Sequence, residues 1–525
     1  MPKVLISDKM SPRAAEVFRR RGVEVDEKTG LSPDELTAII ADYDGLAIRS
    51  STKATADLLE AATQLKVIGR AGIGVDNVDV PAATARGICV MNTPFGNSIT
   101  TAEHAIALMM ALARQLPAAD RSTHAGKWEK SRFMGVELFG KTLGIIGCGN
   151  IGAIVADRAL GLRMRVAAYD PFLSAQRALD LGVEKLGLDE LLARADFLTL
   201  HTPLTDGTRH IINAENLAKM RKGAFLINCA RGELIVEDDV KAALESGQLA
   251  GAAVDVFAVE PAKESVLFGL PNVVATPHLG ASTAEAQENV ALQVAEQMAD
   301  FLVDGAVSNA LNMASVTAEE APRLKPYFEL ARVLGSFAGQ LTETGLKEVH
   351  VEYEGHVATL NTRPLTAILL EGLLRPLSEN VNMVNAPFVA QQRDIDVKET
   401  RDEAPGDYQT HIKLTVTSER QTRSVCGTLF ADSRPRIVQV KGIKLEAEAA
   451  PHMLYMTNED KPGFIGALGT TLGKHGVNIA TFHLGRSAPG GDAISLLEID
   501  QPLSAEALAE VEALPHVMQA KPLSF

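Results

Sequence analysis

Residues 143 to 152 read Leu-Gly-Ile-Ile-Gly-Cys-Gly-Asn-Ile-Gly, and this stretch decides how the middle of the chain folds. Its first four residues are apolar throughout, as in a buried parallel strand. Glycines at GxGxxG spacing follow, and residues 153 to 160 continue with helical character. A strand, a glycine-rich turn and a helix in this order present a helix N-terminus and bare backbone to a pyrophosphate. We therefore expect a Rossmann-type dinucleotide site built on Gly147, Gly149, Asn150, Ile151 and Gly152.

An acidic residue follows the next strand. Residues 166 to 169 are apolar or aromatic and end at Asp170, about 20 residues after the first glycine, the separation typical of an acid that binds a ribose 2′-hydroxyl. A carboxylate at this point would repel a 2′-phosphate. The spacing therefore predicts NAD rather than NADP, although Asp170 could instead be a turn residue before Pro171.

The composition excludes several classes of function. The 525 residues include 66 acidic and 51 basic side chains, and the net charge of -15 argues against a nucleic-acid or anionic-membrane surface. The most apolar helical run, residues 105 to 113, is too short to cross a bilayer. The four cysteines form no CxxC pair, so we expect no metal site, no disulfide scaffold and a cytoplasmic location.

The chain divides into regions of different periodicity. Residues 1–98 alternate short β-branched runs with helical stretches, and residues 99–283 do so again, which predicts two parallel α/β domains. A helix from Ala284 to Val303 leads to an expected linker near Asn309 to Pro326. Residues 311–450 contain alternating strands around one helix, which indicates an α+β domain. The last region, 451–525, has the order βαββαβ of a ferredoxin-like domain.

Charged side chains follow three of the apolar strands of the second region. Arg231 follows one strand, Asp255 and Glu260 follow another, and His278 follows a third. The carboxyl ends of parallel strands are where ligands bind. Oxidation of an alcohol beside a carboxylate needs a base for the hydroxyl proton and a cation for the carboxylate, which Arg binds bidentately. We therefore predict Arg231, Glu260 and His278 as the catalytic set. His104, His201 and His210 rank lower because no such set accompanies them.

These stretches resemble the D-isomer-specific 2-hydroxyacid dehydrogenases, whose motifs CARG, VFxxEP and TPHxG occur here at residues 229–232, 256–261 and 276–280. The similarity extends over about residues 3 to 310. It implies a split substrate domain of the flavodoxin type, 1–98 with 284–310, into which the NAD domain is inserted. It also implies further cofactor-binding residues, namely Thr202, Cys229, Ala230, Arg231, Asp255, His278, Gly280 and Ala281.

The same resemblance implies the substrate site. It assigns Arg49, Ser50, Gly72, Ile73, Gly74 and Asn97 to substrate binding. Arg132 belongs to a segment that in the resembling enzymes can reach a neighbouring subunit's site, and an ordinary surface charge remains an equal alternative for it.

The C-terminal regions narrow the choice of substrate. Residues 451–525 look like an ACT domain and residues 311–450 like the intervening domain of the long-form phosphoglycerate dehydrogenase branch of this family. That resemblance implies oxidation of 3-phospho-D-glycerate in serine biosynthesis, with 2-oxoglutarate reduction as a possible second activity, and a homotetramer. It also implies an amino-acid effector such as L-serine at Asn458, Asp460 and Asn478, although residues 458–463 could simply cap the following helix.

Two other functions stay open at this point. A dehydrogenase for glycerate, glyoxylate or another small D-2-hydroxy acid would gain nothing from a substrate phosphate. An NAD-sensing scaffold, like the corepressors of this fold, would bind partners without turnover, but those proteins lack the two C-terminal regions.

Overall fold

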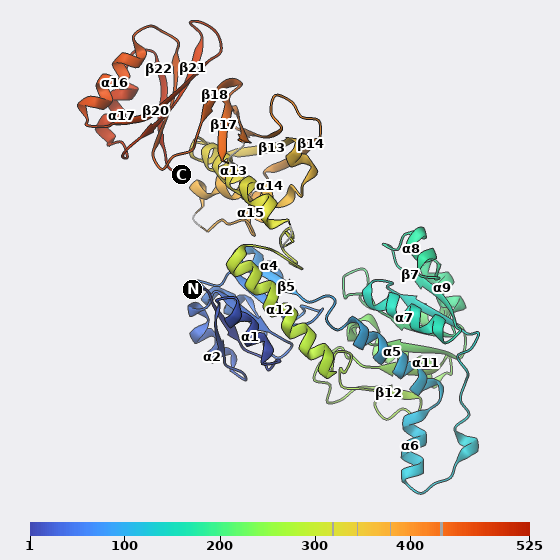
Figure 1. Ribbon diagram of the computed structural model, residues 1–525. Coiled ribbons are helices and arrows are strands. Elements are labelled where there is room, and N and C mark those ends of the chain that lie inside the picture. The colour runs from blue at the N-terminus through green and yellow to red at the C-terminus, as the bar shows by residue number, and fades with distance from the viewer. Residues whose placement is uncertain (318–319, 344, 379, 431–433) are drawn as a thin grey trace.

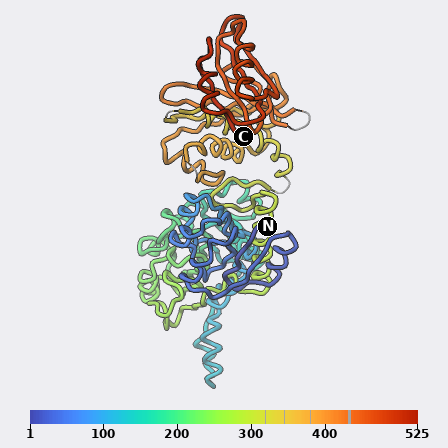
Figure 2. Tube along the Cα trace, turned by 90° about the vertical axis from the view of Figure 1, so that its left-hand side faces the viewer, coloured from blue at the N-terminus to red at the C-terminus, as the bar shows by residue number. Residues whose placement is uncertain are grey.

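The structure is a computed structural model that describes residues 1–317, 320–343, 345–378, 380–430 and 434–525. Its strands form four sheets. Figures 1 and 2 show an elongated molecule in which the two C-terminal sheets lie at one end and the two N-terminal sheets at the other.

The first sheet has the flavodoxin-like order β2-β1-β3-β4-β5, and all its pairs are parallel. Its strands are β1 (Lys3–Ile6), β2 (Glu24–Glu27), β3 (Gly45–Ile48), β4 (Val67–Arg70) and β5 (Cys89–Asn92). The helices between them are α1 (Arg13–Arg20), α2 (Pro33–Ile39), α3 (Ala56–Ala61) and α4 (Val80–Ala85).

A helix from much later in the chain completes this unit. α12 (Ala284–Asp304) packs beside α1, and its Val294 and Met298 share the apolar core of Val4 and Ala14. Gly69 in β4 has no room for a side chain, because a Cβ there would lie 2.2 Å from the Met298 sulfur. The chain therefore returns to its first sheet after building the second, as the split-domain resemblance implied.

The second sheet is parallel, with the order β12-β11-β10-β9-β6-β7-β8. The order reverses between β6 and β9, the switch point where ligands bind in such sheets. Its strands are β6 (Thr142–Ile146), β7 (Arg165–Tyr169), β8 (Glu184–Lys185), β9 (Phe197–Leu200), β10 (Ala224–Asn228), β11 (Leu249–Val254) and β12 (Val273–Ala275). Its helices are α5 (Ser98–Ala113), α7 (Asn150–Gly161), α8 (Ala175–Asp180), α9 (Leu188–Arg194), α10 (Ala214–Lys219) and α11 (Glu237–Glu245).

One helical arm leaves this body. α6 (Leu116–His124) and the segment after it extend away from the second sheet in both views (Figures 1 and 2). Trp128, the single tryptophan, lies in this segment and is 88% exposed.

The third sheet has the order β14-β13-β15-β16-β17-β18 and is antiparallel except for the β13/β14 pair. Its strands are β13 (Leu346–Gly355), β14 (Asp396–Asp402), β15 (Thr410–Ser418), β16 (Thr422–Leu429), β17 (Pro435–Val440) and β18 (Ile443–Ala447). Its helices are α13 (Ala321–Gln340), α14 (Arg363–Leu374) and α15 (Ala386–Gln392).

The expected linker was too long. Helix α13 begins at Ala321 and contains Pro326 in its second turn, so the end of the expected linker is helical. Pro322 lies at the second position of α13, where the N–H has no partner within the helix, whereas Pro326 lies inside the helix and removes one internal hydrogen bond.

The C-terminal sheet has the order β20-β21-β19-β22 and is antiparallel throughout. It is formed by β19 (Met453–Glu459), α16 (Phe464–Lys474), β20 (Ile479–Arg486), β21 (Asp492–Ile499), α17 (Ala505–Glu512) and β22 (Val517–Leu523). This is the predicted βαββαβ arrangement.

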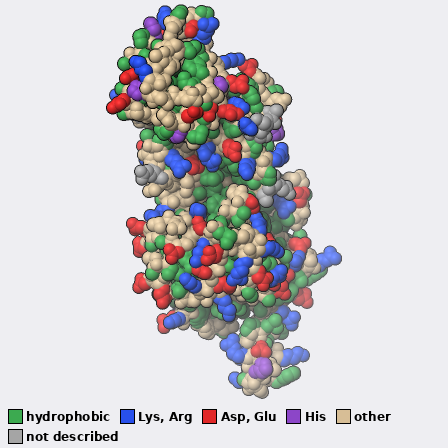
Figure 3. Space-filling view, turned by 60° about the vertical axis from the view of Figure 1, so that its left-hand side comes forward, with side chains coloured by type: hydrophobic (Ala, Val, Ile, Leu, Met, Phe, Trp, Pro, Cys, Tyr) green, Lys and Arg blue, Asp and Glu red, His purple; other side chains and the backbone are tan. Residues whose placement is uncertain are grey.

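The surface of the protein carries charges of both signs. On the face drawn in Figure 3, Lys and Arg side chains alternate with Asp and Glu rather than gathering into a broad basic patch. All four cysteines are buried and unpaired. Among the described residues, no helix combines the length and the apolar character that crossing a membrane requires.

Candidate active site

The glycine-rich turn lies at the switch point of the second sheet. Gly147 has φ +89°, and a Cβ there would lie 2.6 Å from the His201 carbonyl oxygen. A Cβ on Gly152 would lie 2.1 Å from the Gly147 carbonyl oxygen, so the first turn of α7 packs directly on the turn. By contrast, a Cβ on Gly149 would meet nothing within 4 Å. The space before the N-terminus of α7, which begins at Asn150, is therefore open, as a bound pyrophosphate requires.

Asp170 is fixed against this turn. One carboxylate oxygen accepts a hydrogen bond from the Cys148 N–H (2.8 Å), and the other accepts one from the Phe172 N–H (2.8 Å). On the other side of the turn, the Thr202 backbone would lie 2.9 Å from a Cβ on Gly147. The predicted cofactor residues of β6, β7 and β9 thus surround one turn, and they fit a dinucleotide.

Three neighbouring strands of this sheet end in register. Asn228 of β10 pairs with Val254 of β11, which pairs with Ala275 of β12. Neighbouring strands lie about 5 Å apart. The residues that follow these ends, Arg231, Asp255 and His278, are therefore brought to the same edge of the sheet, as the sequence predicted.

His278 and Glu260 form a direct pair. The His278 Nδ1 lies 2.6 Å from one Glu260 carboxylate oxygen, and the Phe257 N–H donates to the other at 3.0 Å. Burial favours a higher pKa for Glu260, but the hydrogen bonds from His278 and Phe257 outweigh it and lower the pKa below its ordinary value. With Nδ1 occupied by a carboxylate, the other imidazole nitrogen is the one available for proton exchange.

Asp255 organises the loop that carries His278. Its side chain is completely buried, and its carboxylate accepts hydrogen bonds from the Thr276 hydroxyl (2.6 Å) and from the N–H groups of Leu279 (2.7 Å) and Gly280 (2.8 Å). Its carbonyl oxygen accepts from the His278 N–H at 2.8 Å. Burial opposes ionisation, but hydrogen bonds from His104, Thr276 and the Leu279 N–H lower the pKa of Asp255. We conclude that Asp255 acts on the backbone of the loop.

A second histidine contacts this aspartate. The Nε2 of His104, on α5, lies 3.2 Å from Asp255. His104 ranked low on the sequence because no acid and Arg at strand ends accompany it, and the structure brings one acid, Asp255, to it. The partner comes about 150 residues later in the chain, and only the packing of α5 on the sheet brings the two together.

The remaining cofactor candidates lie close by. Cys229 is buried, and its burial beside Asp255 raises the pKa of its thiol. The Ala230 N–H donates to the Asn228 side chain at 3.1 Å. The Gly280 carbonyl accepts from Thr101 at 2.8 Å, and Ala281 follows it, half-buried.

Arg231 crosses from the second sheet to the first. Its Nε donates to an Asp76 carboxylate oxygen at 2.9 Å. A Cβ on Gly74 would lie 1.8 Å from its Nη2, so the absence of a side chain at Gly74 lets the guanidinium lie on the backbone of this loop. Asp76 was not among the predicted site residues.

Sequence reasoning also missed Arg70. This side chain ends β4, and its Nε is buried without a partner among the described residues. Gly72, with φ +144°, lies so close that a Cβ would meet its Nη1 at 1.5 Å. Burial lowers the pKa of Arg70 to about 10, and repulsion from Arg231 and Arg49 adds to this. The strand-end rule that selected Arg231 also applies to Arg70, so the signal was present.

The other substrate candidates lie in the loops after β3 and β4 and just before α5. The Arg49 N–H donates to Asp8 (2.6 Å) and its guanidinium to the Lys9 carbonyl (3.1 Å), while Ser50, beside it, is exposed. The carbonyl of Ile73 accepts from the Asn92 side chain at 2.6 Å. Asn97, before α5, has a buried Oδ1 with no partner in the described part of the chain.

Arg132 is not brought to this cluster within one chain. It lies in the segment after α6 that extends from the body, pairs with Glu129 at 3.0 Å and stacks on Phe133.

The effector candidates occupy opposite ends of the C-terminal sheet. Asn458 is buried in β19, and Asp460, just after it, accepts from Arg486 (2.8 Å) and from the Gly490 N–H (3.1 Å). Asn478 precedes β20 and donates to Asp500 at 2.9 Å, at the far end of β21. Helix α16 begins at Phe464 with Gly463 as its N-cap and without a side-chain cap hydrogen bond, so neither Asn458 nor Asp460 caps it through its side chain.

Comparison with known proteins shows which family shares the domains of this chain. Three family descriptions match: "D-isomer specific 2-hydroxyacid dehydrogenase, NAD binding domain" over residues 106–280, "D-3-phosphoglycerate dehydrogenase intervening domain" over 323–441 and "ACT domain" over 452–516. A D-3-phosphoglycerate dehydrogenase of Synechocystis is 44% identical over 522 residues, 99% of this chain and 94% of that protein. This chain belongs to the D-3-phosphoglycerate dehydrogenase family.

Further relatives agree with the membership in this family. The enzyme of the same name from Bacillus subtilis is 41% identical and matches 99% of both chains. Among solved structures, a glyoxylate reductase from Paecilomyes thermophila is 31% identical with a TM-score of 0.56, covering 59% of this chain and 98% of that one. The family is one of nicotinamide-dependent enzymes, which agrees with the open turn at Gly149.

Proposed function

We propose that this chain oxidises 3-phospho-D-glycerate to 3-phosphohydroxypyruvate, the first step of serine biosynthesis, with NAD as the oxidant. The observation that carries this proposal is the hydrogen-bonded pair of His278 and Glu260 on a sheet edge that also carries Arg231 and the dinucleotide turn. When bound, NAD supplies the acceptor for the hydride that leaves the hydroxyl-bearing carbon of the substrate.

His278 is the proposed base. Its Nδ1 bonds to Glu260, so the free ring nitrogen takes the hydroxyl proton as the hydride leaves. Glu260 fixes the orientation of the ring and stabilises the imidazolium that forms, as carboxylates beside catalytic histidines do.

The arginines are the proposed anion holders. Arg231 is placed by Asp76 and binds the substrate carboxylate, for which the planar guanidinium is suited. Arg231 and Arg49 both lie within electrostatic reach of Arg70, and the substrate phosphate would relieve this repulsion. Ser50, Gly72, Ile73, Gly74 and Asn97 would complete this surface, with Arg132 supplied by a second subunit.

The preference for NAD over NADP rests on Asp170. Its carboxylate is held beside the turn by two backbone N–H groups and so presents a fixed negative charge where a 2′-phosphate would lie. We further propose a cytoplasmic homotetramer and the domain limits 1–98 with 284–310, 99–283, 311–450 and 451–525.

The C-terminal domain is the proposed effector site, with L-serine as the first ligand to test. Asn458 and Asp460 lie at one end of β21 and Asn478 at the other, so a ligand that contacts both groups needs two copies of the domain. This supports an effector bound between subunits.

An NADH-absorbance assay tests the proposal. Purified protein should reduce NAD with 3-phosphoglycerate far more efficiently than with glycerate. Equal turnover of glycerate would favour a dehydrogenase for unphosphorylated acids, and no turnover together with NADH-dependent partner binding would favour a scaffold. Parallel assays with L-serine test the effector proposal separately.

A further inference from the structure

A short loop, residues 49–52, follows β3, the central strand of the first sheet. Two polar side chains reach it from the neighbouring strands: Asp8 follows β1, and Asn77 belongs to the segment after β4. Both strands pair with β3 in parallel, so their carboxyl ends meet at the same edge of the sheet. Neither Asp8 nor Asn77 was among the predicted site residues.

Asp8 holds the N–H groups at both ends of this loop. One of its carboxylate oxygens accepts from the Arg49 N–H at 2.6 Å and from the Thr52 N–H at 3.1 Å. The other oxygen accepts from the Thr52 hydroxyl at 2.8 Å. Asp8 is buried, and hydrogen bonds to a charged acceptor are strong where water is excluded. These bonds fix the two ends of the loop relative to each other.

Asn77 holds the carbonyl groups of the same two residues. Its side-chain nitrogen donates to the Arg49 carbonyl at 2.6 Å and to the Thr52 carbonyl at 2.7 Å, which uses both of its amide hydrogens. Two side chains therefore bind all four backbone polar groups at the ends of the loop. Such a complete set of bonds leaves the loop one conformation.

The donors in the middle of the loop are free. Ser50 and Ser51 are exposed, and their N–H groups have no hydrogen-bond partner among the described residues. The Arg49 guanidinium donates to the Lys9 carbonyl at 3.1 Å, a neutral acceptor, and forms no ion pair in the described part of the chain. Successive backbone N–H groups beside an unpaired cation suit an anion.

The pKa of Arg70 shows which charged groups lie near this loop. Burial and repulsion from Arg231 and Arg49 lower it, whereas the carboxylates of Asp76 and Asp8 act in the opposite direction. Asp8 and Arg49 are therefore within electrostatic reach of the same buried cation as Arg231. The loop thus borders the cluster that is proposed to hold the substrate carboxylate.

Asn77 also joins the loop to the segment that contacts Arg231. Asp76, the residue before it, accepts from the Arg231 Nε at 2.9 Å. Gly74 lies so close to the Arg231 guanidinium that a Cβ there would meet it at 1.8 Å. One short segment therefore contacts both the loop and the cation, and it sets the distance between them.

We propose that Asp8 and Asn77 are positioning residues for the substrate phosphate. They fix the loop so that the Arg49 side chain and the N–H groups of Ser50 and Ser51 receive this group. The inference rests on the proposed oxidation of 3-phospho-D-glycerate. Because Asn77 sets how far the loop lies from Arg231, the two residues favour a substrate with a phosphate, rather than a hydroxyl group, on its third carbon.

Steady-state NADH-absorbance assays with 3-phosphoglycerate and with glycerate test this role. The readout is the ratio of kcat/KM for the two acids, because only the phosphate distinguishes them. In Asn77→Ala and in Asp8→Ala this ratio should fall about tenfold or more, while kcat/KM for glycerate changes by less than about threefold. Asp8→Asn should stay within about threefold of the wild type, because its amide oxygen can still accept from both N–H groups and its NH₂ can donate to the Thr52 hydroxyl.

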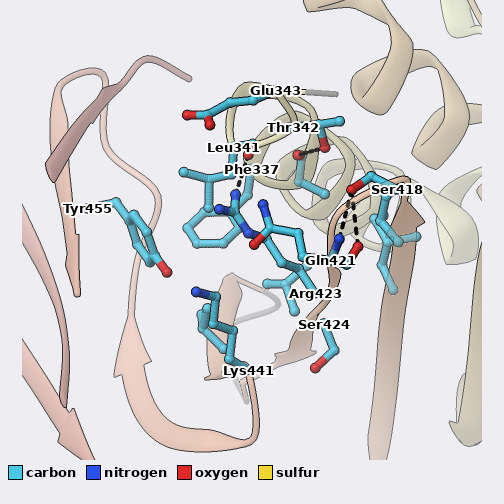
Figure 4. A pocket seen from close by; sticks show the side chains of 15 residues that line it. Phe337, Leu341, Thr342, Glu343, Ser418, Gln421, Arg423, Ser424, Lys441 and Tyr455 are labelled. Atoms are coloured by element: carbon cyan, nitrogen blue, oxygen red, sulfur yellow. Dashed lines mark hydrogen bonds between the residues drawn. The ribbon is translucent and has the colours of Figure 1, made fainter. Parts of the chain in front are cut away.

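Two control variants remove similar bonds elsewhere. Asn312 donates to the Ile88 carbonyl at 2.8 Å and accepts from the Val90 N–H at 2.9 Å, at the amino end of β5. Ser418 ties the turn after β15 by donating to the Gln421 carbonyl at 3.1 Å (Figure 4). Asn312→Ala and Ser418→Ala should keep the wild-type ratio. Melting temperatures of all variants separate a loss of stability from a loss of discrimination.

The outcomes distinguish the positioning role from the proposed function. A wild-type ratio in Asn77→Ala, or an equal loss of activity toward both acids, would overturn the positioning role and leave the proposed function intact. A wild-type protein that oxidises both acids equally well would overturn the proposed function and this inference with it. If Asp8→Ala does not fold, Asn77→Ala decides, because the Asn77 side chain is only half-buried.

Discussion

At the scale of single residues, the pair of His278 and Glu260 is the most specific feature of the site. Replacing His278 by Ala removes the proposed base, so kcat should fall by about 100-fold to 10,000-fold while the affinity for NAD changes little. Steady-state NADH-absorbance assays give kcat, and NADH fluorescence titration gives the affinity. His124→Ala, an exposed histidine on the α6 arm, is the control and should retain full activity. Full turnover in His278→Ala would exclude this mechanism.

Glu260 acts through the same ring. Its pKa is lowered, so its carboxylate stays charged at neutral pH and stabilises the protonated imidazole. In Glu260→Gln the neutral amide loses this effect, so the acidic limb of kcat/KM should move to lower pH. The pH profile of the two proteins measures this, and a limb that stays in place would show that Glu260 does not act on His278.

Asp170 decides between the two cofactors. Asp170→Ala removes the charge that would repel a 2′-phosphate, so the ratio of kcat/KM for NAD to that for NADP should fall about tenfold or more. The change also frees the Cys148 and Phe172 N–H groups, so melting temperature is recorded alongside. An unchanged cofactor ratio would refute the assignment.

Some residues of the site could be predicted from the sequence, and others could not. Arg231 and His278 each follow an apolar strand closely, so local sequence indicated their edge of the sheet. His104 lies in the middle of a helix and meets Asp255 only through tertiary packing, which no local pattern reveals. The pairing of Arg231 with Asp76 likewise joins two sheets that are distant in sequence.

At the scale of elements, the loop between β12 and α12 depends on one buried carboxylate. Asp255→Asn keeps the size of the side chain but replaces one carboxylate oxygen by an NH₂ group, which then faces either the Leu279 or the Gly280 N–H donor. We expect the free energy of unfolding to fall by about 2 to 4 kcal/mol and kcat to fall with it, because the loop carries His278.

The pH dependence of this effect follows from the lowered pKa of Asp255. The stability that the carboxylate contributes is complete above its ordinary pKa of about 4 and is lost as the pH falls through the lower value of the folded state. Urea unfolding of both proteins at pH 7 and near pH 3 should therefore show a smaller difference in acid. A constant difference would mean that Asp255 acts by packing alone.

Element order was largely predictable where the periodicity was clear. The C-terminal βαββαβ order came from alternating strands separated by helices that are apolar on one face, and the structure has it. In the third region only the helix near residue 370 was expected, whereas α13 and α15 are also present. Proline near the start of each of these two helices masked the helical pattern.

At the scale of the whole molecule, contacts between distant segments hold the third region to the first sheet. The side chains of Asn382 and Asn385 donate to the carbonyls of Gly87 (2.9 Å) and Ala85 (3.3 Å), about 300 residues away. Such contacts leave no periodic signal in the sequence, since each depends on a single polar side chain in a loop.

Asn382 is the test of this junction. Its amide nitrogen would lie 2.2 Å from a Cβ on Gly87, so the side chain packs on bare backbone, and its oxygen accepts from the Val384 and Asn385 N–H groups. Asn382→Ala removes these bonds, so amide hydrogen exchange should rise in residues 84–88 and 382–386 while turnover at saturating substrate stays near that of the wild type. Gln176→Ala, whose side chain bonds only within exposed α8, is the control. Unchanged exchange in residues 84–88 would mean that apolar packing, rather than these asparagines, holds the two regions together.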